Sequence, residues 1–182
     1  MRYLLAGLLI LGLVGLASQS YAGTTENITV YVKIQNLSVA VSPTSYNFGT
    51  VTEGWSGVAT SSITVTNDGN VAEVFKLKIA SEPNGSWTSV TAATPGSEEY
   101  RLSAVFKGSQ PSTYGAEDSF SVSTERTATT TDLAETGGDE GEKGYNVAES
   151  AERGLWFKFE APSATIITTE QSIIAQVTAA AY

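Results

Sequence analysis

An alternation of apolar and polar residues with a period of two is the feature that most constrains the fold of this chain. It is clearest in segments 28–34, 37–41, 63–66, 75–79, 102–106, 155–160 and 173–177. Successive side chains of a β-strand point to opposite faces, so this pattern predicts strands with one face turned toward a core. No segment has the i, i+3, i+4, i+7 spacing of an amphipathic helix. We therefore expect an all-β protein of about seven to nine short strands, arranged as a sandwich of two antiparallel sheets.

Turn residues separate the expected strands. Asn67-Asp68-Gly69-Asn70 lies between two alternating segments. Asp-Gly favours a type I′ turn, in which both central residues need positive φ, so we expect a hairpin here. Ser42-Pro43 and Pro95-Gly96 indicate further breaks between strands.

The first residues have the three parts of a secretory signal peptide. Arg2 supplies a positive charge, Leu4 to Ala17 are apolar or glycine, and small residues precede a cleavage site after Ala22. A membrane anchor is the alternative, but 14 residues of helix reach only about 21 Å, short of the ~30 Å hydrocarbon core. We therefore expect residues 1–22 to be removed. The mature chain is then secreted or displayed at the cell surface, with no segment inserted in the membrane.

The composition excludes several classes of function. The chain has 19 acidic and 10 basic residues, and it contains no cysteine and no histidine. A nucleic-acid partner is not expected, because no basic stripe exists to displace counterions from phosphates. Thiol and imidazole nucleophiles, relays and metal ligands are absent from the sequence. We therefore expect a protein that is not an enzyme and that needs no cofactor.

One acidic segment differs from the rest. Between Glu117 and Glu152 there are ten acidic and two basic residues, and its glycine-rich centre predicts a long solvated loop over residues 125–146. Asp139, Glu140 and Glu142 are oxygen ligands of the kind calcium prefers, but their spacing is not that of an EF-hand. A plain solvated loop is the favoured interpretation, and we assign no metal ligand. Glycosidase chemistry is not expected either, because no apolar environment is evident that would raise the pKa of one carboxyl of a pair.

The tryptophans are candidates for a contact surface or a carbohydrate platform, although core packing is their commoner use. Trp156 is distinctive because its phase places it opposite the apolar face of segment 155–159. It is therefore either covered by another element or exposed as a contact residue. We take Trp156 and the acidic loop as candidates for the outer contact surface.

The alternating segment nearest the predicted cleavage site is the most informative candidate. Its apolar face consists of Ile28, Val30, Val32 and Ile34. In one interpretation it is the first strand of its own sandwich. In the other it completes the sheet of a neighbouring subunit, where main-chain hydrogen bonds give affinity and the four apolar side chains fill pockets.

Residues 37–79 resemble the immunoglobulin-like modules of bacterial exported proteins. The resemblance lies in Ser42-Pro43, in Phe48-Gly49, and in Val65-Thr66-Asn67-Asp68-Gly69-Asn70. It implies an immunoglobulin-like sandwich and says little about function. More loosely, the order of features is similar to that of surface-filament subunits assembled by donor strands.

These observations predict a signal peptide (1–22), an extended donor strand (23–36) and a β-sandwich with one acidic loop (37–182). The expected function is that of a structural subunit of an extracellular filament or surface matrix. Its expected partners are copies of itself in a head-to-tail polymer. The alternative is a monomeric secreted module that binds polysaccharide or calcium.

Overall fold

The computed structural model describes residues 26–83, 87–92, 94–135 and 137–182. The chain divides into two units, residues 1–33 and residues 34–182. The predicted signal peptide lies outside the described residues. Among the residues that are described, no helix is long and apolar enough to cross a membrane.

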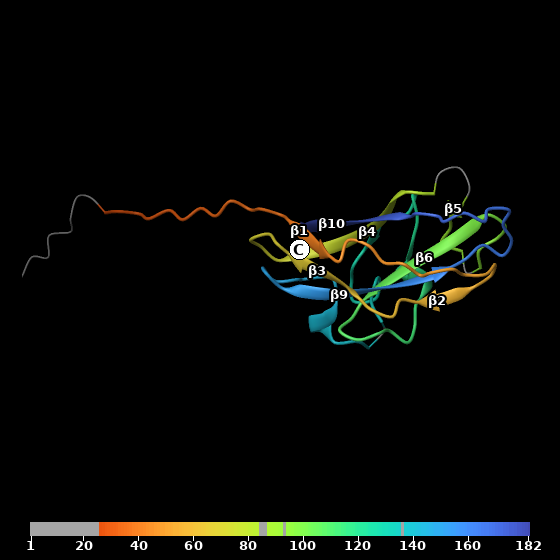
Figure 1. Cartoon of the computed structure of the whole chain (residues 1–182). Helices are drawn as coiled ribbons and strands as arrows, with labels where there is room; N and C mark the ends of the chain where they lie inside the picture. Colours follow the sequence, from red (N-terminus) through yellow and green to blue (C-terminus); the bar gives the residue numbers. More distant parts are fainter. Residues whose placement is uncertain (1–25, 84–86, 93, 136) are drawn as a thin grey trace, which may run out of the picture. The chain divides into compact units, whose positions relative to one another are not determined.

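Two sheets make up the second unit (Figure 1). The larger has the order β1-β3-β9-β6-β5, with β2 paired to β9 and β7 paired to β6, and the smaller has the order β10-β4-β8. The larger sheet contains β1 (Val39–Ser42), β2 (Ser56–Val58), β3 (Ile63–Asn67), β5 (Thr88–Ser89), β6 (Glu99–Phe106), β7 (Ser119–Phe120) and β9 (Glu152–Glu160). The smaller contains β4 (Glu73–Ser81), β8 (Arg126–Thr127) and β10 (Ile174–Ala181). Two short 3-10 helices, η1 (Ala116–Asp118) and η2 (Glu140–Glu142), lie in the connections.

The core forms between the two sheets, as the alternation predicts. Phe75, Leu77 and Ile79 on β4 are fully buried, whereas Lys76 and Lys78 between them are only partly buried. The ring of Phe75 meets that of Phe106 on β6 across the sandwich, with centroids 5.6 Å apart. The prediction of an all-β sandwich is confirmed. One detail differs, because β5 runs parallel to β6 and makes the larger sheet mixed.

The predicted hairpin at Asn67-Asp68-Gly69-Asn70 is wrong. Its two flanking strands, β3 and β4, belong to different sheets, so the turn carries the chain from one layer to the other. The side chain of buried Asn67 explains the difference. Its Nδ2 donates to the carbonyls of Val71 and Val147, both at 2.8 Å, and its Oδ1 accepts from the N–H of Gly69. These bonds hold a compact turn that needs no ladder between β3 and β4.

The acidic loop is more deeply packed than its composition predicts. Leu133 is fully buried near its middle, and the Leu133 carbonyl accepts a hydrogen bond from the N–H of Phe106 at 2.9 Å. Lys143 is 4% exposed, and its Nζ donates to the Thr130 carbonyl and to Glu140. The prediction of a solvated loop is therefore correct only for its outward-facing residues. Single apolar residues anchor it to the sandwich.

Candidate interaction site

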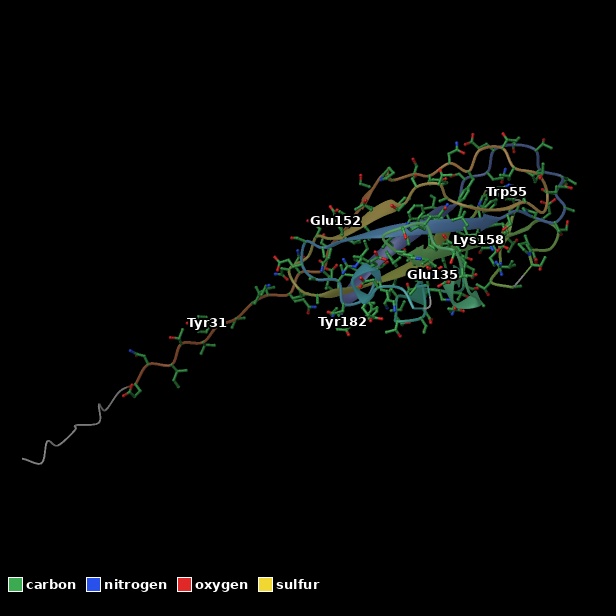
Figure 2. All side chains as sticks on the ribbon, turned by 90° about the horizontal axis from the view of Figure 1, so that it is seen from below. Tyr31, Trp55, Glu135, Glu152, Lys158 and Tyr182 are labelled. Atoms are coloured by element: carbon green, nitrogen blue, oxygen red, sulfur yellow. The ribbon has the colours of Figure 1, made fainter. Side chains whose placement is uncertain are left out.

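Residues 26–33 form neither a strand nor a helix, although their alternation is the most regular in the sequence. Ile28 is 89% exposed, Val30 77% and Val32 83%, and Ile34 at the start of the second unit is 83% exposed. Tyr31, on the alternate face, is 90% exposed (Figure 2). A strand gains stability from ladder hydrogen bonds and from burial of one face. This segment has a strand-forming sequence, and none of the described strands pairs with its backbone.

The second unit holds the beginning of its own chain firmly. The side-chain amide of Asn70 donates to the Ile34 carbonyl and accepts from the N–H of Asn36, both at 2.8 Å. The backbone N–H of Asn70 donates to the Asn36 carbonyl, and that of Asp68 donates to the Ser38 carbonyl. The turn after β3 thereby fixes the point at which the exposed segment ends and the folded unit begins. The sequence predicted a turn here, but it did not predict that the turn also binds the backbone of residues 34–38.

Glu73 completes this anchor. Its Oε1 accepts the N–H of Ser38 at 2.8 Å, while Oε2 is buried without a hydrogen-bond partner. Burial raises the pKa of Glu73, and the nearby charge of Asp68 raises it further, although the bond from Ser38 opposes the shift. A buried carboxylate at this position was not foreseen, because Glu73 lies before the alternating segment 75–79 and the sequence gives no sign that β4 begins there.

Trp156 is covered rather than exposed. Its side chain lies on β9, the residue is 9% exposed, and its indole N–H donates to the Lys107 carbonyl at 2.9 Å. The neighbouring Leu155 and Phe157 are also buried, so this part of β9 is covered on both faces. Trp156 as a surface contact residue is therefore a wrong prediction. The alternation correctly placed Trp156 on the face of β9 opposite Leu155 and Phe157, but it could not show that this face is also buried.

The other two tryptophans pack against the apolar core. Trp55 lies against Phe48, with ring centroids 6.1 Å apart. Trp87 stacks on Phe159 at 6.2 Å, and its indole N–H donates to Thr165 at 3.0 Å. Both tryptophans are partly buried, and these contacts use part of the ring surface that a carbohydrate platform would have to present.

Carboxylates of the acidic loop form hydrogen bonds and ion pairs with residues close to them in the sequence. Asp139 accepts the N–H of Gly141 at 2.9 Å, and Glu140 pairs with Lys143 at 2.7 Å. Among the described residues, no three acidic side chains gather in a way that could hold a metal ion. The described residues therefore provide no preformed calcium site in support of the binding-module alternative.

Two carboxyl groups of this region have strongly different pKa values, which the sequence did not lead us to expect. Burial raises the pKa of Asp118 to about 7, although the backbone N–H groups of Gly115 and Ala134 bind its oxygens. Hydrogen bonds from Lys107 and Ser112 lower the pKa of Glu135 to about 2. Such a split is also typical of acid–base pairs in enzymes. Asp118, however, is 1% exposed with both oxygens bound, so its evident task is to hold the backbone around η1.

Neither a protein-family model nor a curated protein matches the chain.

Proposed function

We propose that the chain is a structural subunit of an extracellular filament or surface matrix. In this assembly, residues 26–34 of one copy add as a β-strand to a sheet of the next copy. The observation that supports the proposal is the exposure of Ile28, Val30, Val32 and Ile34 in a segment that has a strand-forming pattern and no strand partner.

The energetics favour a partner for this segment. Full burial of one Val or Ile side chain stabilises by about 1.5–3 kcal/mol, so four provide roughly 6–12 kcal/mol before the cost of association. Ladder hydrogen bonds would add register and affinity. Association itself costs about 4–15 kcal/mol, so the burial of these four side chains offsets a large part of that cost and the ladder hydrogen bonds must supply the rest.

The geometry of strand donation leads to a polymer. The donating segment and the receiving sheet are different surfaces of one chain, so the contact is head-to-tail. Such contacts give rings when the rotation closes and open filaments when it does not. The predicted signal peptide places this polymer outside the cell. A chain without cysteine has no disulfides, and contacts with neighbouring subunits offer another source of stability.

Deletion of residues 25–35 tests the proposal. It removes the donated segment and the anchor bond to the Ile34 carbonyl, and it keeps the anchor bonds at Asn36 and Ser38. The purified deletion variant should stay folded by circular dichroism and form no polymer in electron micrographs or in sedimentation velocity. Normal polymerisation of the variant would contradict strand donation.

Two matched variants separate the apolar face from the mere length of the segment. Replacement of Ile28, Val30, Val32 and Ile34 by serine should abolish assembly, whereas Thr29→Ser with Tyr31→Ser should leave it largely intact. The binding-module alternative predicts instead a compact monomer in every case. It also predicts that a polysaccharide or calcium raises the melting temperature.

A further inference from the structure

A subunit that donates a strand must also carry a sheet edge that receives one. We propose that the receiving edge is β10, and that its occupant is residues 28–34 of a second copy of this chain. This assignment rests on the proposed function. It adds the location of the partner surface, and both must hold for the polymer to form as described.

The backbone of β10 has one unused side. In an antiparallel pair, alternate residues point their N–H and C=O groups toward the partner strand or away from it. Phe75 on β4 donates to Gly144 at 2.8 Å and accepts from Ala128 at 2.9 Å, so its backbone points away from β10. Ala179 lies opposite Phe75, and its own groups therefore point away from β4. The same holds at each second position of β10, namely Ala175, Val177 and Ala181.

These outward groups are open to a partner. β10 lies at the end of its sheet with β4 as its neighbour. Within the described residues, no backbone hydrogen bond from another part of the chain reaches the outward groups of these four residues. The other edge strands provide a shorter backbone for pairing, because β5 and β8 have two residues each and β1 has four. Of the end strands in the described part of the chain, β10, with eight residues, is the one that matches the length of the donated segment.

The composition of β10 leaves it unprotected. Exposed edge strands usually carry charges, proline or bulges that prevent pairing with other chains. β10 reads IAQVTAAA and contains no charged residue and no proline. A register shift occurs between Ile174 and Ala175, so residues 175–181 pair regularly with β4. A regular, uncharged edge of this length is predicted to pair with another strand unless it is covered.

The core beside β10 is also incompletely covered. Ile173, Ala175 and Val177 pack against the core but are only partly buried. β1 forms one edge of the larger sheet and β10 one edge of the smaller, and these two edges approach each other in the sandwich (Figure 1). The inward side chains of β10 are small, mostly alanine, which leaves room for larger ones from an added strand. Two isoleucines and two valines on one face of the donated segment suit that space.

The two segments have the same length and the same alternation of apolar positions. Residues 28–34 and residues 175–181 both contain seven positions, with apolar side chains at the first, third, fifth and seventh. A centred pairing sets Tyr31 beside Thr178 on the solvent face, whether the strands run parallel or antiparallel. The same pairing turns both apolar faces toward the core.

Disulfide trapping tests this pairing cleanly, because the chain has no cysteine of its own. Copies carrying only Tyr31→Cys are mixed with copies carrying only Thr178→Cys, allowed to assemble, and oxidised. Intact-mass analysis then measures the mixed disulfide, which can form only between two molecules. Copies with Ala40→Cys on the exposed face of β1 serve as the matched control. We expect at least tenfold more disulfide with Thr178→Cys than with Ala40→Cys.

The other outcomes are equally decisive. Polymers whose disulfides form equally or preferentially with Ala40→Cys would overturn β10 as the acceptor and leave strand donation standing. Failure of the unmodified chain to polymerise would overturn the proposed function itself. A double variant, Tyr31→Cys with Thr178→Cys, that closes a disulfide within one dilute molecule would show that the segment pairs with its own β10.

A proline variant gives a second measurement. Val177→Pro removes one outward N–H of β10 and no hydrogen bond to β4, so the monomer should fold and assembly should be lost. Val41→Pro is the control, because Val41 on β1 also points its N–H away from its partner β3 and should assemble normally. Val177→Lys provides the same test through an inward-pointing charge if the proline variant does not fold. Normal polymers from a folded Val177→Pro or Val177→Lys variant would contradict the assignment.

Discussion

The carboxylate of Glu73, at the start of β4, accepts the backbone N–H of Ser38 at 2.8 Å, just before β1. Together with the Asn70 bonds to Ile34 and Asn36, this contact defines where the folded unit begins. A donated strand needs such an anchor, because tension on the strand must be transmitted to the sandwich rather than peel β1 away. The fixed point and the exposed apolar segment are adjacent in sequence.

Removal of the Glu73 side chain should weaken this anchor. Glu73→Ala leaves the Ser38 N–H unpaired and opens space in the core, so we expect a loss of about 1–3 kcal/mol in the free energy of unfolding. Glu73→Gln keeps an acceptor for Ser38 without a buried charge and should be less destabilising at neutral pH. Urea unfolding followed by circular dichroism measures both. Equal losses in the two variants would mean that the acceptor is unimportant.

Asp118 should give the protein a stability that falls with rising pH. Its folded pKa of about 7 exceeds the ordinary value of 3.8 given for an Asp carboxyl, so the folded state binds more protons than the unfolded state between these values. The resulting stabilisation is fully present below the unfolded pKa and is lost as the pH rises toward 7. The slope is at most about 1.4 kcal/mol per pH unit for one group.

Asp118→Asn isolates that contribution, because asparagine does not titrate. The difference in unfolding free energy between the original chain and the variant should change between pH 4 and pH 7 and level off above it. Chemical denaturation at a series of pH values measures this difference. A difference that is constant over the whole range would show that the carboxyl titrates normally.

Leu133 should be the main apolar anchor of the acidic loop. Leu133→Ala leaves a cavity beneath a fully buried position, and we expect a loss of about 2–5 kcal/mol in the free energy of unfolding. Thr130→Ala, at an exposed position of the same loop, is the control and should change stability by less than about 0.5 kcal/mol. Similar effects from the two substitutions would restore the interpretation of this loop as solvated throughout.

Period-two alternation predicted the all-β class and the buried faces of β3 and β4, because a strand with one face in a core must repeat every two residues. On β6 it predicted only one of two buried faces, since Ser103 and Val105 are buried as well. It could not assign strands to sheets. The Asp68-Gly69 turn has hairpin residues, yet the side chain of Asn67 directs the chain into the other layer. The alternation likewise could not decide between a covered and an exposed Trp156, and the composition of the acidic loop gave no sign that Leu133 is buried. What covers a residue is decided by distant parts of the chain.

The candidate site was predicted in part. The sequence singled out Ile28, Val30, Val32 and Ile34 as one apolar face, and in the structure these side chains are exposed. It did not identify the anchor formed by Asn70 and Glu73, because isolated polar residues in a turn give no signal of distant hydrogen bonds. It also could not identify β10 as an edge strand, because the alternation of residues does not indicate the order of strands in a sheet.

Amide hydrogen exchange of residues 28–34, measured as a function of protein concentration, tests strand donation most directly. If the segment pairs with other copies, its amides should exchange rapidly in dilute monomer and become strongly protected once polymers form. Protection that is already complete in dilute monomer, or fast exchange that persists in the polymer, would contradict the account.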